Sequence, residues 1–166
     1  MKRIICLLLA FCFMLLTGCT QKSDTQYTSV NFYYRTDPIN YESEDGIITV
    51  EARRINGPAD DYNDLLVQYL NGARKRDCIS PFPAGTTLEE FSVNDTEAVV
   101  VLSSHLSLLT DYELMIACVC LAKTVFDFSD VQSVRISSLH NYLNGEPYLV
   151  IGKDSFVLYD HSSMQD

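Results

Sequence analysis

The chain has 166 residues, of which 47% are hydrophobic and 20% are charged, so it can bury the core of one globular domain. Acidic residues outnumber basic ones by 22 to 12, and the formal net charge at pH 7 is −10. Nucleic acid requires a basic face on its partner, and an acidic chain gains nothing from the charge of an anionic membrane. The composition therefore predicts no nucleic-acid partner.

The chain begins with two basic residues, Lys2 and Arg3, followed by an apolar run at 4–16. A run of this length is typical of a secretory signal and short for a spanning helix, which needs about 20 apolar residues. Leu16-Thr17-Gly18-Cys19 ends the run and resembles the bacterial lipobox. The resemblance implies that residues 1–18 are cleaved and that the Cys19 thiol carries a diacylglyceryl group. It predicts a lipid anchor at the extracytoplasmic face of the cell membrane; an uncleaved N-terminal anchor is the alternative.

Removal of residues 1–18 leaves 148 of the 166 residues, an ordinary size for a single domain. Residues 19–28 comprise the lipidated cysteine and a polar stretch without helix or strand period, which we interpret as a linker. Residues 29–160 then form one domain, and the polar residues 161–166 form a tail.

The first half of the domain predicts two strands and a helix. Residues 28–35 and 47–55 indicate strands, and the second strand carries apolar and polar side chains on opposite sides: Ile48, Val50 and Ala52 against Thr49, Glu51 and Arg53. Gly57-Pro58 opens a helix with Asp60 and Asp61 in its first turn. This helix ends at Asn71-Gly72 and has one apolar stripe: Tyr62, Leu65, Leu66, Tyr69 and Leu70.

The second half predicts more strands around a second helix. Prolines at 81 and 83 exclude a helix or a central strand over residues 79–85. Residues 86–93 and 97–103 predict a hairpin. Residues 131–137 alternate as a strand, and residues 148–151 and 156–159 indicate a terminal hairpin.

The second helix begins at a capping box, Thr110-x-x-Glu113, and runs to about Phe126. Residues 114–122 leave it no polar face, so it must be buried all round, and it is too short to span a bilayer. It is either sandwiched within the domain or covered on one side by another protein. In the second case the candidate contact residues are Ile116, Val119 and Cys120, together with exposed strand edges.

The predicted order is β-β-α-β-β-α-β followed by a C-terminal hairpin. Two helices packed on a mostly antiparallel or mixed sheet make an α+β two-layer sandwich. Three cysteines stay in the mature chain: Cys78, Cys118 and Cys120. We expect them to pack as small hydrophobic side chains, although a bridge from Cys78 to either of the others stays open.

Two charged clusters border the first predicted helix. Arg74-Lys75-Arg76 follows the helix, where complementation of the helix dipole is favoured over a binding patch. Asp60, Asp61 and Asp64 lack the spacing of a calcium loop and suit a charged first helical turn. No metal site is predicted from either cluster.

Residues 30–139 resemble a GerM domain, the sporulation and germination module of Gram-positive lipoproteins. The resemblance rests on short elements in a fixed order: Tyr33-Tyr34, Glu51-Ala52-Arg53-Arg54-Ile55, Leu70-Asn71-Gly72, Pro83-Ala84-Gly85-Thr86-Thr87-Leu88, a valine-rich strand ending at Ser103, Lys123-Thr124-Val125, and residues 131–136. Ala73 stands where the family usually has proline, and Ser137-Ser138 where it tends to have Asp-Gly. The resemblance implies a non-catalytic domain, similar to ring-building modules that assemble with partner membrane proteins between mother cell and forespore.

Two other classes of function compete with this interpretation. An enzyme would draw on His105, His140 and His161, but none has a metal-ligand spacing and Ser103-Ser104-His105 is not a nucleophile elbow. We therefore predict no catalytic residue, no cofactor and no metal. A lipoprotein that binds a small ligand or envelope component would need an apolar pocket, with Tyr33, Tyr34 and Tyr41 as lining residues.

The sequence therefore favours a lipid-anchored, extracytoplasmic protein-interaction domain acting in sporulation or germination. Its mechanism is non-catalytic: the lipid confines the domain to one membrane surface, and its surface assembles with a protein partner or with itself.

Overall fold

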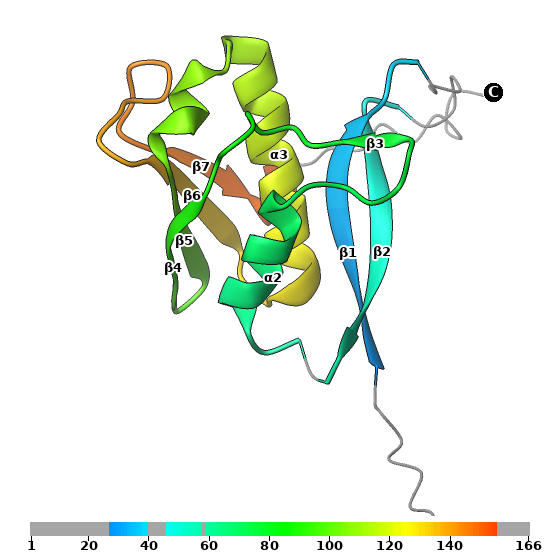
Figure 1. The fold of residues 1–166 in the computed structure, drawn as a ribbon. Coiled ribbons are helices and arrows are strands. Elements are labelled where there is room, and N and C mark those ends of the chain that lie inside the picture. The colour runs from blue at the N-terminus through cyan, green and yellow to red at the C-terminus, as the bar shows by residue number, and fades with distance from the viewer. Residues whose placement is uncertain (1–26, 40–45, 58, 156–166) are drawn as a thin grey trace, which may run out of the picture.

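The computed structural model describes residues 27–39, 46–57 and 59–155 (Figure 1). Several features predicted from the sequence lie outside these residues: the signal peptide, Cys19, most of the linker, Tyr41, Pro58, the strand at 156–159 and the tail with His161. Within the described part of the chain, no helix is both long enough and apolar enough to cross a membrane.

The described strands follow the predicted order but form two sheets. The first sheet is antiparallel with the order β2-β1-β3, and the second has the order β4-β5-β6-β7 with a parallel β5–β6 pair. The strands are β1 Tyr27–Thr36, β2 Ile48–Asn56, β3 Cys78–Ile79, β4 Leu88–Asn94, β5 Glu97–Leu102, β6 Ser133–Ser138 and β7 Leu149–Gly152. The helices are α2 Tyr62–Leu70 and α3 Asp111–Phe128, with 3₁₀ turns η1 Ser104–Leu108 and η2 Lys153–Ser155.

The predicted α+β sandwich of two helices with antiparallel and mixed strands is confirmed. Its strands are divided between two sheets because α3 lies between them, with β1 and β2 on one side and the β4–β7 sheet on the other (Figure 1). Along its length α3 contacts β1 on one side and β6 and β7 on the other. The hydrophobic core therefore lies against both of these sides of the helix.

The position of α3 explains why it has almost no polar face. Met115 is 55% exposed and lies on the one side that the sheets leave open. The buried side chains cover the rest of the helix surface: Leu114, Ile116, Ala117, Cys118, Cys120, Leu121, Ala122, Thr124 and Val125. The predicted capping box is present, because the Glu113 carboxylate accepts the Thr110 N–H at 3.2 Å. The helix ends at Phe128, two residues beyond the predicted end. Burial within the domain explains most of its apolarity, but the prediction of burial on all sides is wrong, because Met115 is exposed.

Polar side chains of α3 also cover the edge of β1 that does not pair with β2. The Tyr33 N–H donates to Thr124 Oγ1 at 3.0 Å, and the Asn31 N–H donates to the Asp127 carboxylate at 3.0 Å. The Tyr33 carbonyl accepts the Tyr69 hydroxyl at 2.7 Å. Backbone groups that would otherwise be unpaired at a sheet edge are thus satisfied by helices. This arrangement joins the first sheet to the rest of the domain.

The first helix begins later than the sequence predicts. The structure starts α2 at Tyr62, because the side chain of Asp61 accepts the Asp64 N–H at 3.0 Å and so caps the helix. Its predicted apolar stripe is buried, and Tyr69 lies at the centre of an aromatic cluster. The Tyr69 ring centroid lies 5.0 Å from that of Tyr34 and 5.7 Å from that of Phe32.

Two strands differ from the sequence-based prediction. Cys78 and Ile79 form the short edge strand β3, which pairs with the end of β1 and which the sequence did not indicate. Pro81 follows within two residues, so the strand cannot continue. The strand β7 pairs with β6, with Leu149 opposite Ile136. The predicted partner of β7 in a terminal hairpin lies outside the described residues.

Candidate functional site

The three predicted contact residues of α3 differ from one another in how far they are exposed. Cys120 is fully buried and Ile116 is 8% exposed, whereas Val119 is half-buried. The all-round apolarity that suggested them is accounted for by the two sheets, so Cys120 presents no surface to a partner. Ile116 differs from Cys120 because it lies at the bottom of a surface hollow.

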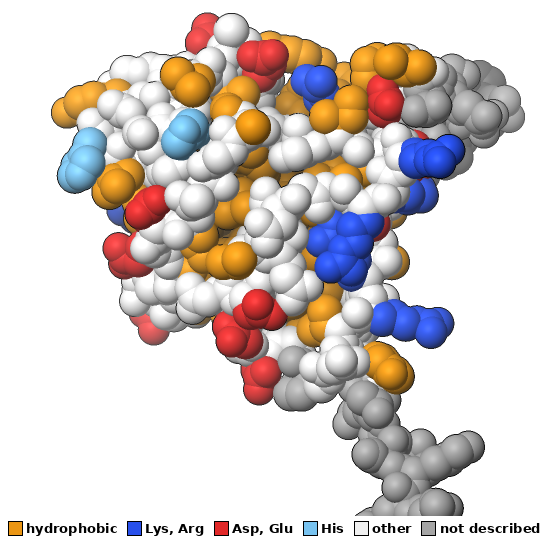
Figure 2. All heavy atoms as spheres, viewed as in Figure 1, with side chains coloured by type: hydrophobic (Ala, Val, Ile, Leu, Met, Phe, Trp, Pro, Cys, Tyr) orange, Lys and Arg blue, Asp and Glu red, His pale blue; other side chains and the backbone are white. Residues whose placement is uncertain are grey.

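This hollow lies where β1 ends and α3 begins. Two adjoining pockets, of about 350 and 300 Å³, share the residues Arg35 and Ile116, and together we call them the Arg35 groove. The larger pocket is also lined by Thr36, Pro38, Ile47 and Tyr112, and the smaller by Ser80, Pro81, Phe82, Pro83, Leu108, Leu109 and Glu113. Hydrophobic side chains gather over this upper end of the molecule (Figure 2).

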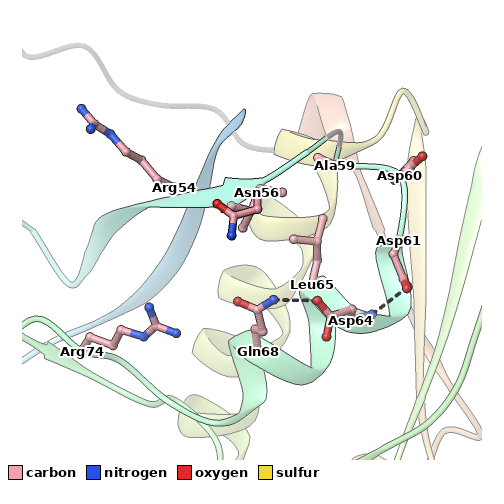
Figure 3. A pocket seen from close by; sticks show the side chains of 10 residues that line it. Arg54, Asn56, Ala59, Asp60, Asp61, Asp64, Leu65, Gln68 and Arg74 are labelled. Carbon is pink, nitrogen blue, oxygen red and sulfur yellow. Dashed lines mark hydrogen bonds between the residues drawn. The ribbon is translucent and has the colours of Figure 1, made fainter. Parts of the chain in front are cut away.

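A second pocket, of about 470 Å³, lies between the end of β2 and α2 and is strongly polar (Figure 3). Arg54 and Arg74 line one side, and the other side carries the acidic cluster Asp60, Asp61 and Asp64. Two of these carboxylates serve the helix: Asp61 caps it, and Asp64 accepts the Gln68 amide at 2.7 Å. Among the described residues, no group of histidine, cysteine or carboxylate side chains is arranged to hold a metal.

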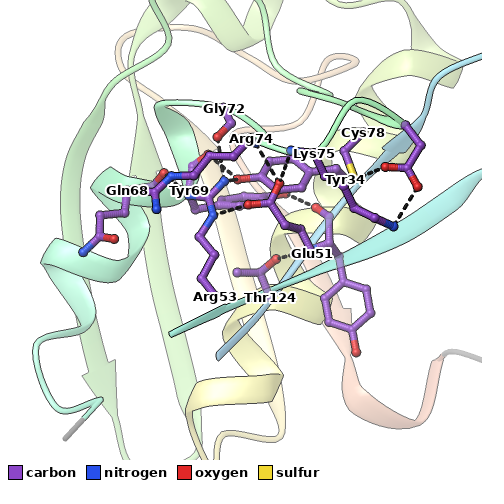
Figure 4. A network of polar contacts seen from close by, with 12 residues as sticks. Tyr34, Glu51, Arg53, Gln68, Tyr69, Gly72, Arg74, Lys75, Cys78 and Thr124 are labelled. Carbon is purple, nitrogen blue, oxygen red and sulfur yellow. Dashed lines mark hydrogen bonds and ion pairs between the residues drawn. The ribbon is translucent and has the colours of Figure 1, made fainter. Parts of the chain in front are cut away.

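The innermost polar network of the first sheet centres on Glu51 and Arg53 of β2 (Figure 4). These side chains are 7% and 4% exposed and form an ion pair. The second carboxylate oxygen of Glu51 accepts the Arg74 N–H at 2.7 Å and the Lys75 N–H at 2.9 Å. Arg53 donates to the carbonyls of Gln68 and Gly72 and to the Tyr34 hydroxyl: 3.0, 2.7 and 2.9 Å.

This network assigns a role to the basic run that the sequence left open. Arg74-Lys75-Arg76 lies beyond the C-cap Asn71, and the last turn of α2 contains no basic residue, so dipole complementation does not explain it. Its first two backbone N–H groups instead hold the Glu51 carboxylate. The Glu51–Arg53 pair thus holds the loop after α2 against the first sheet. Both the loop, through Arg74, and the end of β2 line the polar pocket.

The pKa values of Glu51 and Tyr34 are shifted in this network. Burial alone raises the pKa of Glu51, but hydrogen bonds from Arg53 and from the backbone of Lys75 and Arg74 outweigh it and hold the pKa below its usual value. Burial raises the pKa of Tyr34 to about 12, although the neighbouring Arg53 charge acts in the opposite direction. Both groups therefore keep their ordinary protonation state at neutral pH.

We expect the Glu51 carboxylate to make the stability of the domain depend on pH. Because the pKa of Glu51 is lower in the folded chain, its stabilising contribution is complete above the unfolded pKa of about 4.3 and is lost as the pH falls through the folded value. In urea unfolding followed by circular dichroism, the free-energy gap between the chain and Glu51→Gln should be constant near neutral pH and narrow below about pH 4. A gap that stays constant to about pH 3 would contradict this linkage.

His105 lies beside Ser103, which connects β5 to β6 and to the segment before β4. Ser103 Oγ lies 3.2 Å from His105 Nδ1 and accepts the Thr87 N–H at 3.1 Å, while the Ser103 carbonyl accepts the Ser138 hydroxyl at 3.2 Å. Ser103 is itself 7% exposed. These contacts hold the segment before β4 against the ends of β5 and β6.

The tyrosines proposed to line a ligand pocket do not form one in the described chain. Tyr34 is fully buried, and its hydroxyl donates to the Tyr69 carbonyl at 3.1 Å. Tyr33 is half-buried with the Lys123 ammonium 5.0 Å from its ring centroid. Successive residues of a strand point to opposite faces, so these two rings cannot line one cavity.

The three described cysteines are free and buried, so the bridge from Cys78 to Cys118 or Cys120 is not formed. Burial raises the pKa of Cys78 to about 11 and the pKa of Cys118 and Cys120 to about 12. Only thiolates react readily, so the buried cysteines should react slowly with Ellman's reagent near pH 8. The measurement uses a chain that starts at Thr20, which contains only these three cysteines. In urea all three thiols should react. Rapid reaction of any one in the folded chain would contradict their burial.

The fold and its polar groups define an α+β domain whose buried Glu51–Arg53 pair serves structure and whose described surface includes an apolar groove and a polar pocket. The chain belongs to the Germane family, described as "sporulation and spore germination", whose model matches residues 31–141. It is therefore a domain related to sporulation and germination. No curated protein matches the chain in sequence.

Solved structures show the same fold. The tandem GerMN domains of the Bacillus subtilis sporulation protein GerM are 15% identical, with a TM-score of 0.55 over 79% of this chain and 47% of that chain. The first GerMN domain of the same protein is 15% identical, with a TM-score of 0.50 over 72% of this chain and 92% of that one. This chain thus corresponds to about half the length of the tandem protein.

The sequence missed the Glu51–Arg53 network. Its only signal was two charged residues two positions apart on a predicted strand, which places them on one face. The alternation was read correctly, but Val50 is 42% exposed and the polar face is the one that packs against the domain. The Arg35 groove left no signal, because its walls come from several separate segments between Arg35 and Ile116.

Proposed function

We propose that this chain is a membrane-anchored extracytoplasmic lipoprotein whose domain assembles with a protein partner in sporulation or spore germination, without catalysing a reaction. The observation that carries the proposal is the order of the chain: a lipobox at Cys19 lies directly ahead of a Germane domain. A diacylglyceryl group supplies two acyl chains, and two chains anchor a protein stably where one is marginal. The acidic surface then needs no attraction of its own to the membrane.

The arrangement of the domain supports an assembly role over a chemical one. The charged pair that is most deeply buried is used to hold a loop, and the described cysteines are protonated at neutral pH. Ile116 is the predicted contact residue that still reaches a surface hollow, and it remains a candidate for contact with a partner.

The anchor is tested by Cys19→Ala, expressed in a sporulating Gram-positive host with the unaltered chain as control. We expect the unaltered chain to sediment with membranes and to show, by mass spectrometry, an N-terminal diacylglyceryl cysteine. In the variant the lipoprotein pathway should not remove the signal sequence, and the mass of the lipid should be absent. The variant should also fail to support sporulation or germination where the unaltered chain does. An unacylated, uncut chain that sediments like the variant would overturn the anchor.

A further inference from the structure

The strongest unassigned feature is the Arg35 groove, which combines three observations that the described residues do not explain. Its larger pocket contains Thr36, whose hydroxyl is buried at 6% exposure and finds no hydrogen-bond partner among the described residues. The Thr36 N–H is satisfied by the Ile47 carbonyl at 2.9 Å, so only the side chain is left over. Buried polar groups in native proteins are nearly always paired, and an unpaired hydroxyl on a residue that lines a pocket indicates a missing partner.

The second observation is the charge at the middle of the groove. Arg35 is half-buried where the two pockets meet, and none of the described carboxylates forms an ion pair with it within 4.0 Å. Glu113 lines the smaller pocket and its carboxylate accepts both the N–H and the hydroxyl of Thr110, which lower its pKa; the Arg35 charge contributes least to that shift and forms no ion pair with it within 4.0 Å. The guanidinium is therefore available to a carboxylate that arrives from outside.

The third observation is the apolar rim. Leu108 is 72% exposed, Tyr112 is 64% exposed and Ile47 is 53% exposed, and these residues border the two pockets. Large apolar side chains that are exposed around a concave surface are typical of a binding site. Two pockets joined side by side give an elongated site, which suits a length of polypeptide better than one compact molecule.

From these observations we propose that the Arg35 groove binds an extended segment of a partner polypeptide that carries an acidic residue between two apolar ones. This inference names the chemistry of the partner and rests on the assembly role proposed above. In an extended chain, side chains two positions apart point the same way and lie about 6.7 Å apart. The fitting pattern is thus apolar-x-acidic-x-apolar, with the carboxylate on Arg35 and one apolar side chain in each pocket. Because the Thr36 hydroxyl is buried in the free chain, its side chain turns toward the pocket on binding, and a backbone carbonyl of the segment then accepts the hydroxyl.

The test is a selection of random 12-residue peptides on the full chain, immobilised in dodecyl-maltoside micelles, with empty micelles as background. Enriched peptides are then titrated by fluorescence anisotropy. We expect them to share the apolar-x-acidic-x-apolar pattern. Arg35→Glu should weaken their binding at least about tenfold, in line with the energy of a charge-assisted pair. Arg54→Glu, which makes the same charge change on an exposed strand residue outside the groove, should change the affinity less than about twofold.

Two further variants separate binding from folding. Tyr112→Ala removes an exposed rim side chain and should weaken binding several-fold with an unchanged circular dichroism spectrum. Thr36→Val removes the unpaired hydroxyl in nearly the same volume, so it should weaken peptide binding while leaving the free chain at least as stable in urea. A Thr36→Val chain that is destabilised and binds peptide normally would show that the hydroxyl serves the fold.

Other results would overturn the proposal. These are peptides without an acidic residue, equal losses in Arg35→Glu and Arg54→Glu, or complete competition by N-acetyl-leucine, which would point to a small-molecule site. A dimer in sedimentation that Arg35→Glu abolishes would place a second copy in the groove. Peptide binding only after deletion of residues 156–166 would place the chain's own end there. None of these results bears on acylation at Cys19, so the anchor and the groove fail separately.

Discussion

Replacement of Arg53 by methionine is expected to lower the free energy of unfolding by about 3–5 kcal/mol, the usual effect of removing one partner from a buried ion pair. Methionine keeps much of the side-chain length and the apolar contact with Phe32. In the unaltered chain the Phe32 ring centroid lies 4.7 Å from the guanidinium carbon of Arg53. It removes the charge that offsets Glu51 and every donor to the loop after α2. The main cost is therefore the carboxylate that stays buried without its cation.

Arg54→Met is the matched control for this prediction. Arg54 is the next residue of the same strand, but it is exposed and points into solvent at the rim of the polar pocket. The same substitution there should change the free energy of unfolding by no more than about 0.5 kcal/mol. Urea unfolding of both variants measures the difference directly. Similar small effects at the two positions would mean that the buried network contributes little to stability.

Truncation of Leu121 to alanine is the second large effect, expected to cost about 2–5 kcal/mol. Leu121 is fully buried in the middle of α3, between the two sheets, so the cavity it leaves cannot collapse against one layer alone. The loss should appear as a lower urea midpoint with an unchanged slope, because the surface exposed on unfolding is nearly the same.

Met115→Ala provides the comparison within the same helix. Met115 is 55% exposed and has a helix propensity close to that of alanine, so we expect a change below about 0.5 kcal/mol. If the two truncations cost the same, α3 would not lie between two sheets in solution. If Met115→Ala were the more costly of the two, the exposed side of α3 would be covered by another chain.

Short-range patterns predicted the two helices and most of the strands. The stripe from Tyr62 to Leu70 became the buried face of α2, and the Thr110-x-x-Glu113 box marked the start of α3. Such signals work because capping and amphipathic packing act within one or two turns of a helix. The predicted start of α2 was wrong by a few residues because Asp61 serves as the cap and not as part of the first turn.

The pairing of strands and the choice of buried face could not be predicted in the same way. Alternation showed that Glu51 and Arg53 share one side of β2, but it could not show that this side faces the core. The deciding groups are the Tyr34 hydroxyl and the backbone of the loop after α2, which reach the pair only in the folded chain. Buried charges are tolerated where such partners are supplied, and no pattern within β2 announces them.

By itself the sequence predicted the order of the elements and the fact that most of α3 is buried, and it is the sequence alone that predicts a leader with a lipobox at Cys19. Each of these depends on composition or on spacing within about twenty residues. Tertiary structure alone decided what covers α3, which polar groups are buried, and that Arg35, Thr36 and Tyr112 meet around one groove. These depend on contacts between distant segments, because a helix or a strand specifies which of its residues share a face but not what that face meets.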